Sequence, residues 1–424
     1  MKILIRAAKI LDKTSVRNGY IRDILIENGI ITQIGEKLTV EADQIITQPD
    51  LHVSAGWFDM RVHAKDPGHE YKEDLESLSN AALAGGFTEI ALLPNTKPTI
   101  QSKESLAYFH RFSARNLLQL HPMAAITLDT QGKDFTEMID LHTAGAVAFT
   151  DGIHPIENPD ILLKTLQYLT QVKGLLVNRP EETALTHYGL MHEGITSTLT
   201  GMKGIPAIAE EMMVYRDLKL LEYLDIKSDV PVLHFATIST KEAVRMIREA
   251  KAKGLAVSCD VAAHQVAFDD TVLSGFDTNL KVNPPFRSQE DIKAIWEGLA
   301  DGTIDAIVSD HNPQEEDAKN IEFDRAEFGV IGLETAFSVI NSLNDKLTLE
   351  QLIEKFTINP RRILRQPQPK IEIGEVANLT VFSPTIDWVF EEKAIQSKAK
   401  NSPFIGIKMK GKAVAVFNNR LMKA

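Results

Sequence analysis

Residues 230–261 read VPVLHFATISTKEAVRMIREAKAKGLAVSCDV and contain a strand, a helix and a second strand in order. The apolar runs Val230–Phe235 and Ala256–Val261 are short and bounded by polar residues, which is typical of buried strands. Between them, Lys241–Lys253 places apolar side chains at i, i+3 and i+4, as a helix with one core-facing side requires. This order predicts neighbouring parallel strands in an α/β protein.

The same alternation extends through the middle of the chain. Short apolar runs are separated by amphipathic segments such as Asp74–Ala84 and Gln289–Leu299. Eight strands alternating with helices is the count of a (β/α)8 TIM-type barrel. An open doubly wound sheet is the alternative, but no Gly-x-Gly-x-x-Gly follows an early strand. The expected strands are Trp57–Val62, Glu89–Leu93, Met123–Thr127, Ala146–Thr150, Leu175–Val177, Val230–Phe235, Ala256–Val261 and Asp305–Ser309.

Both ends of the chain have a different pattern. Ile24–Ile34 predicts a hairpin, because Asn28-Gly29 at its centre favours a tight turn with positive φ. Near the other end, Asn378–Phe382 and Ala413–Phe417 are short runs rich in β-branched or aromatic residues. The expected domains are a small β-sandwich-like domain, residues 1–50 together with 370–424, and a barrel domain, residues 51–369.

Composition excludes several classes of protein. The chain is 44% hydrophobic and 25% charged, as in globular proteins. Lys and Arg total 46 against 58 Asp and Glu, and the resulting charge of −12 disfavours binding to nucleic acid or an anionic membrane. The lone Cys259 cannot form an internal disulfide, and we find neither a signal peptide nor a run of 18 apolar residues. We therefore expect a cytoplasmic globular protein.

Polar side chains follow almost every expected strand. The active site of a barrel is built at these carboxyl ends. Polar residues end strands in any protein, so one such position says little, whereas polar groups at seven of eight strand ends indicate a site. The residues at these ends are Arg61, His63 and Lys65, then Asn95, Asp151, Asn178, His234 with Thr237, His264, and Asp310 with His311.

Several segments carry a resemblance to a known family. They are Gly56–Gly68 (GWFDMRVHAKDPG), Ala84–Thr88, Pro94–Pro98, Asn283–Arg287, Asp310–Pro313 and Ser397–Phe404. In composition and order they resemble the dihydroorotases of the amidohydrolase superfamily. This resemblance implies a barrel with a small β domain from both termini, and a role in de novo pyrimidine biosynthesis. The implied reaction is the hydrolysis of dihydroorotate to N-carbamoyl-aspartate and its reverse.

The resemblance also implies a zinc site. Bound zinc lowers the pKa of a water molecule from 15.7 to about 7 and polarises a carbonyl, and it needs about three or four protein ligands. In the family these are a His-x-His on strand 1, an acidic residue or modified lysine after strand 4, histidines on strands 5 and 6, and an Asp on strand 8. Of these, His63 and Asp310 remain here. Asp310 also holds the position of the general base, and Asp151 is a further candidate ligand.

The other ligand positions have been replaced, by Arg61, Gly152, Asn178 and Thr237. Two ligands do not hold zinc tightly, and Arg61 places a permanent positive charge where the cation belongs. We therefore expect no bound cofactor. Without a metal, Asp310 and Asp151 would be buried with no counter-charge, so we predict an ion pair between Arg61 and one of them.

The substrate side of the site is altered less. Lys65 stands where the family's arginine grips the substrate carboxylate, and a lysine cannot make a bidentate fork. Gln314 replaces a family histidine, whereas Asn95 and Asn283 are retained. By resemblance, these four residues are the candidates for substrate binding.

Two functions stay open, and the ligand losses favour the first. In the first, the chain is an inactive dihydroorotase homologue that serves as an assembly partner of aspartate transcarbamoylase, and the resemblance implies a homodimer. In the second, it is an active dihydroorotase with an unusual or single-metal zinc site built on His63 and Asp310, with Asp151 or a loop histidine. A metal-free activity or a ligand sensor in the retained pocket is a third reading.

Overall fold

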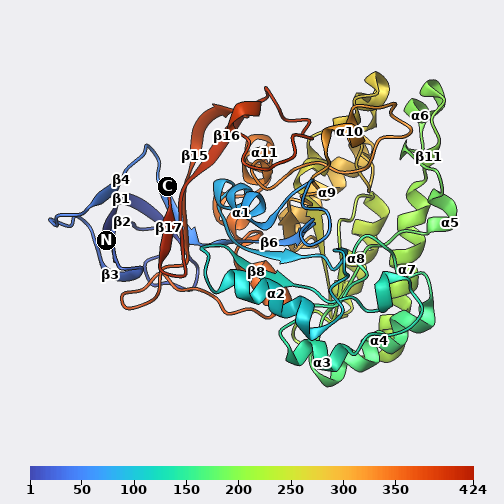
Figure 1. Ribbon diagram of the computed structural model, residues 1–424, viewed down its shortest axis with the longest axis horizontal. Coiled ribbons are helices and arrows are strands. Elements are labelled where there is room, and N and C mark those ends of the chain that lie inside the picture. Colours follow the sequence, from blue (N-terminus) through green and yellow to red (C-terminus); the bar gives the residue numbers. More distant parts are fainter.

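The computed structural model describes residues 1–424. A β-rich part that holds both termini lies at one end, beside a larger part in which helices surround parallel strands (Figure 1). The predicted α/β fold, a TIM-type barrel with a small β domain built from both termini, is confirmed.

The β-rich part is one eight-stranded sheet in the order β17-β16-β15-β5-β1-β2-β3, with β4 paired to β1. β15 pairs antiparallel with both β5 and β16, and so joins the two ends of the chain. β5 therefore belongs to this sheet, although it lies just inside the segment expected to form the barrel. The strands are β1 (Lys2–Leu11), β2 (Ile21–Glu27), β3 (Ile30–Gly35), β4 (Gln44–Ile46), β5 (His52–Ala55), β15 (Leu379–Val389), β16 (Lys408–Asn418) and β17 (Leu421–Lys423).

The predicted hairpin is β2–β3. Asn28 and Gly29 form its turn with φ of 51° and 76°, the left-handed values that a two-residue type I′ turn needs. A Cβ at Gly29 would lie 2.3 Å from the Cα of Arg420. Glycine at this position therefore lets the turn pack against the C-terminal hairpin.

Parallel strands form the barrel. One group is β6-β7-β8 and the other is β9-β12-β13-β14. Phe149 bridges them through single parallel pairings with Ala124 and Leu176, and a pairing between Val62 and His311 closes the ring. The strands are β6 (Trp57–Val62), β7 (Phe87–Leu92), β8 (Gln119–Pro122), β9 (Leu176–Asn178), β12 (Leu233–Phe235), β13 (Val257–Ala262) and β14 (Ala306–Val308).

Two expected strands differ from the structure. The third was placed at Met123–Thr127, but β8 is Gln119–Pro122, and beyond it only isolated bridges remain, a parallel one at Ala124 and an antiparallel one at Thr127. The fourth, Ala146–Thr150, is reduced to the bridges of Phe149. Short strands of this kind pair through only a few residues. An apolar run in the sequence therefore predicts that a strand is present but not where it begins and ends.

Helices cover the outside of the barrel (Figure 1). In residues 230–261, the side chain of Thr240 accepts a hydrogen bond from the Ala243 amide and caps the helix between β12 and β13. A separate two-stranded sheet, β10 (Met191–His192) with β11 (Gly204–Ile205), lies outside the barrel. The helices are α1 (Leu75–Ala84), α2 (Lys103–Ser113), α3 (Met138–Thr143), α4 (Pro159–Gln171), α5 (Thr183–Thr186), α6 (Ile195–Thr200), α7 (Ala207–Leu224), α8 (Lys241–Ala252), α9 (Gln289–Asp301), α10 (Glu316–Lys319), α11 (Ala336–Leu343), α12 (Leu349–Glu354) and α13 (Ile358–Leu364).

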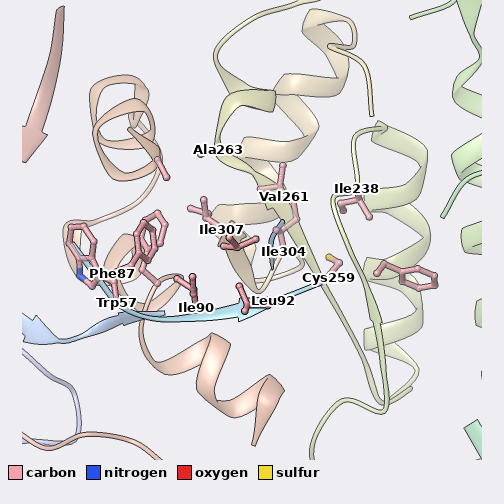
Figure 2. Close-up of a cluster of buried hydrophobic side chains, with 14 of the residues drawn as sticks. Trp57, Phe87, Ile90, Leu92, Ile238, Cys259, Val261, Ala263, Ile304 and Ile307 are labelled. Atoms are coloured by element: carbon pink, nitrogen blue, oxygen red, sulfur yellow. The ribbon is translucent and has the colours of Figure 1, made fainter. Parts of the chain in front are cut away.

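The main hydrophobic core lies between the strands and the surrounding helices (Figure 2). Trp57 at the start of β6 is fully buried, stacks on Phe356 with ring centroids 5.7 Å apart, and donates from its indole nitrogen to Ser54. This core fixes the first strand, whose other end carries Arg61 and His63. No helix is long and apolar enough to cross a membrane.

Candidate functional site

A cavity of about 400 Å³ opens at the carboxyl ends of the barrel strands. All four substrate-binding candidates and both remaining ligand candidates line it, namely Lys65, Asn95, Asn283, Gln314, His63 and Asp310. A larger cavity of about 680 Å³ lies at the opposite ends of the strands, where Gln119 begins β8 and Gly174 precedes β9. Because barrel sites form at the carboxyl ends, the smaller cavity is the candidate site.

Arg61 and Asp310 form a buried ion pair on one side of this cavity. Arg61 Nε lies 2.8 Å from Asp310 Oδ1, and the two side chains are 4% and 10% exposed. The predicted ion pair is confirmed, and its partner is Asp310. Burial alone would raise the pKa of Asp310, but the nearby Arg61 and His63 outweigh it and hold that pKa well below its usual range.

Asp59 fixes the backbone beneath this ion pair. Its carboxylate oxygens accept hydrogen bonds from the amides of Arg61 and Ser309, both at 2.9 Å, and so tie β6 to the residue after β14. Burial raises the pKa of Asp59 to about 7. Asp310 itself has φ of 47°, a left-handed conformation that costs a non-glycine residue energy and is typical of functional positions.

His63 lies against the same carboxylate. Its Nε2 is 3.4 Å from Asp310 Oδ1. Burial lowers the pKa of His63 to about 4, although Asp310 acts in the opposite direction. At neutral pH the imidazole is therefore uncharged, and Arg61 supplies the positive charge that balances Asp310.

Lysine side chains occupy the outer part of the cavity. Lys65 Nζ donates to Asn312 Oδ1 at 2.7 Å, and burial together with Lys72 lowers the pKa of Lys65 to about 8. Lys72 Nζ donates to Gln314 Oε1 at 2.7 Å and pairs with Glu315 at 3.0 Å. Lys72, which was not among the residues predicted from the sequence, thus fixes the side chain of Gln314 through a hydrogen bond.

Arg179 is the main site residue that the sequence analysis missed. It follows Asn178 at the end of β9, lines the cavity, and forms an ion pair with Glu181. Glu181 also accepts a hydrogen bond from Asn283 at 3.2 Å. Burial, then the charge of Arg61, lowers the pKa of Arg179 to about 10. Its position directly after Asn178, at the end of a strand, is the sequence feature that could have identified it as a site residue.

Three residues at positions where the family resemblance implies metal ligands do not line this cavity. Asn178 Nδ2 donates to Asp217 Oδ2 on α7 at 2.6 Å, so its side chain is engaged with the surrounding helices. Thr237 is buried, and its amide donates to Asp260 at 2.6 Å. Neither residue lines the cavity. At Gly152, an added Cβ would lie 1.7 Å from Asn95 Oδ1, so this position has no room for the family's acidic side chain.

Asp151 also has a structural environment. Its carboxylate accepts hydrogen bonds from the amides of Ile126 and Thr127 at 2.9 and 3.0 Å, and from the Thr127 hydroxyl at 2.6 Å. It does not line the cavity with His63 and Asp310. The structure therefore does not bring Asp151 to the position of a third metal ligand.

The residues present do not fit a zinc ion. No group of three His, Cys, Asp or Glu side chains lies close enough together to hold a metal. The fixed positive charge of Arg61 contacts the carboxylate that would be a ligand. A zinc site needs about three or four protein ligands of these types, and in this cavity only His63 and Asp310 lie side by side.

The chain is similar to known proteins over almost its whole length. A family model described as Dihydro-orotase-like matches residues 52–243, and the Amidohydrolase family model matches residues 205–419. A dihydroorotase of Trichlorobacter lovleyi is 39% identical over 417 residues, which is 97% of each chain. A dihydroorotase of Geotalea daltonii is 40% identical over 417 residues, again 97% of each chain.

Solved structures share the fold. The L-hydantoinase of Arthrobacter aurescens superimposes with a TM-score of 0.84 at 22% identity, covering 100% of this chain and 96% of the other. A dihydropyrimidinase of Brevibacillus agri gives a TM-score of 0.80 at 18% identity, covering 100% and 95%. Identities this low support the fold alone, whereas the full-length relatives at about 40% identity show the family. The chain belongs to the dihydroorotase-like family of the amidohydrolases.

Proposed function

We propose that this dihydroorotase-like chain has lost dihydroorotase activity and keeps the fold for assembly. The observation that carries the proposal is the buried ion pair between Arg61 and Asp310. In the family a zinc ion contacts the aspartate at this position. Here a guanidinium contacts it, and the positions that would complete a metal site hold residues that are not zinc ligands.

The chemistry supports the same conclusion. Opening a cyclic amide near neutral pH needs a strong nucleophile and a polarised carbonyl, and zinc would supply both. Without it, a side chain must take a proton from water. Asp310, with its pKa held well below the usual range, and His63, with a pKa of about 4, are weak bases at pH 7.

Dihydroorotate hydrolysis by the purified protein tests the proposal. The assay is run with and without added zinc, beside the Geotalea daltonii dihydroorotase as control. We expect no turnover above the rate in buffer under either condition. Clear zinc-dependent turnover would contradict the proposal.

An active enzyme with a single-metal site is the second candidate. The specific observation in its favour is that His63 and Asp310 remain together, with 3.4 Å between their facing atoms. Elemental analysis separates the candidates, because an active single-metal enzyme must purify with zinc in a ratio near one per chain. Zinc far below that ratio, in protein that unfolds cooperatively, favours the first proposal.

We propose aspartate transcarbamoylase as the assembly partner, a homodimer as the state of the chain, and the cytoplasm as its location. The partner comes from the family resemblance. Large exposed apolar side chains, which often mark contact surfaces, add support. Those of segment 185–223 are Leu185, Tyr188, Ile195, Leu199, Ile208, Met212, Tyr215 and Tyr223. This segment includes α5, α6 and α7 at the edge far from the β-rich part (Figure 1).

Gel filtration of the two proteins, alone and mixed at micromolar concentration, tests the assembly. We expect a shared peak with aspartate transcarbamoylase that the variant Ile195→Ser/Leu199→Ser forms less well. These two side chains are 80% and 82% exposed, so the substitutions should leave the fold intact. Separate peaks for the unmodified proteins would contradict the assembly role.

A further inference from the structure

Two arginines in the cavity carry buried N–H groups with no acceptor in the protein. Arg61 uses Nε for Asp310, while its Nη1 has no hydrogen-bond partner. Arg179 uses Nη2 for Glu181, while its Nε has none. The Arg61 side chain is 4% exposed and that of Arg179 is 11% exposed. Buried donors are normally satisfied, so these two groups point to an acceptor from outside the chain.

More polar atoms at the same end of the barrel are unsatisfied. Thr237 follows β12, and its buried hydroxyl has no partner. His264 follows β13, and neither of its ring nitrogens has one. Burial lowers the pKa of His264 to about 4, so the uncharged ring has one N–H to donate at neutral pH. Neither residue lines the cavity, but each adds an unpartnered donor and acceptor at this end of the barrel.

The lining of the cavity is richer in cations than the chain as a whole. Four cationic side chains line it, Arg61, Lys65, Lys72 and Arg179. The carboxylates around them are Asp310 and Glu327 in the lining, and Glu181 and Glu315, which pair with Arg179 and Lys72. The chain as a whole carries a charge of −12. Cations gathered in a partly enclosed cavity raise the local concentration of anions. The lining therefore offers an anion several cationic partners, although the chain as a whole is acidic.

We infer that this cavity binds a small oxyanion, such as a carboxylate, through Arg61 Nη1 and Arg179 Nε. The site that holds a cation in the family thus takes an anion in this chain. The inference rests on the proposed function in one respect, because it requires that zinc is not bound between His63 and Asp310. Guanidinium groups suit the ligand, since their N–H groups match the geometry of carboxylate and phosphate oxygens.

Neutral variants allow the site to be tested without leaving a buried charge unpaired. Arg61→Gln/Asp310→Asn removes both members of one ion pair, and Arg179→Gln/Glu181→Gln removes both members of the other. Arg248→Gln is the matched control. Arg248 pairs with Asp301, and their side chains are 41% and 44% exposed.

Isothermal titration of zinc-free protein with succinate and with inorganic phosphate measures binding, with chloride at equal ionic strength as the control for screening. We expect one site per chain for at least one of the two probes. Each double variant should bind that probe at least about tenfold more weakly, because a charge-assisted hydrogen bond is worth that much. Arg248→Gln should bind as the unmodified protein does. Succinate alone identifies a carboxylate site, and phosphate alone identifies a phosphate site.

Two results would overturn the inference. One is no heat of binding with either probe at about 10 mM, where even a millimolar site would be nearly filled. The other is unchanged binding in both double variants when circular dichroism shows that they are folded. Zinc content and dihydroorotate hydrolysis are measured on the same preparation. A zinc-free, inactive protein that binds no anion contradicts this inference alone, whereas a zinc-loaded, active protein contradicts the proposed function.

Discussion

Replacing Arg61 with methionine removes the counter-charge of Asp310 and keeps much of the side-chain length. Because the two side chains are 4% and 10% exposed, Asp310 cannot recover full hydration. Breaking a buried ion pair from one side costs about 3–5 kcal/mol, whereas replacing both partners by neutral groups is often close to neutral. We expect Arg61→Met to lose about 3 kcal/mol, and Arg61→Met/Asp310→Asn to recover most of that loss.

The pH dependence separates lost charge from lost packing. In the unmodified protein the ion pair holds the pKa of Asp310 low, so its stabilisation is complete above the unfolded-state pKa of about 3.9 and is lost as the pH falls below it. In Arg61→Met, burial acts with much less opposition and raises the pKa of Asp310. Protonation then relieves the unpaired charge, so the deficit relative to the unmodified protein should shrink between pH 7 and pH 5.

Urea unfolding followed by tryptophan fluorescence measures the effect at both pH values. The chain has three tryptophans, and Trp57 lies in β6 with Arg61. Arg248→Met, at an exposed ion pair, should cost less than about 1 kcal/mol. The reasoning is refuted if Arg61→Met loses no more than this control, or if its loss is the same at pH 5 and pH 7.

Three further predictions concern Gly152, the four substituted ligand positions and Glu334. Gly152→Ala should cost about 1–3 kcal/mol more than Gly132→Ala in urea unfolding, because both glycines have φ of +69° but only at Gly152 would the Cβ meet an atom, Asn95 Oδ1 at 1.7 Å; equal losses would exclude this clash. Restoring the family ligands at positions 61, 152, 178 and 237 together should give less than one zinc per chain by elemental analysis, because the Asn178 side chain faces Asp217; stoichiometric zinc would contradict the placement of that strand end. Burial raises the pKa of Glu334 to about 7, so stability should fall as the pH rises from about 5 to 8, and Glu334→Gln should reduce that fall by up to about 3 kcal/mol; an unchanged slope would show that Glu334 is not the group responsible.

Much of the site was predictable because strand ends in a barrel converge on one place. Apolar runs of the sequence marked where β6, β7 and β14 end, and the residues that follow, His63, Asn95 and Asp310, line the same cavity. The ion pair was predictable from charge alone. An arginine beside a buried aspartate, with too few ligands for a metal, had to be neutralised by it.

The direction of each side chain was not predictable. Asn178 and Arg179 are adjacent, and the sequence analysis chose Asn178 because it stands at the family's ligand position. Adjacent residues of an extended strand point to opposite sides, and here Asn178 contacts Asp217 while Arg179 lines the cavity. Asp217 is on α7, far along the chain, and no local pattern links it to Asn178. The side-chain direction of Asp151 was not predictable either. Its hydrogen-bond partners, Ile126 and Thr127, follow β8 and are distant from it in the sequence.

The two surviving ligand residues do not by themselves argue for a surviving enzyme. The guanidinium of Arg61 is buried and needs a negatively charged partner. Asp310 is that partner, so it is required for stability whether or not the chain has any catalytic activity. His63 also has a structural role, because its uncharged ring packs against Asp310 beside the ion pair. Loss of Asp310 would leave Arg61 and Arg179 close together with less negative charge to balance them. The ion pair with Arg61 is therefore a sufficient structural reason for this chain to keep Asp310.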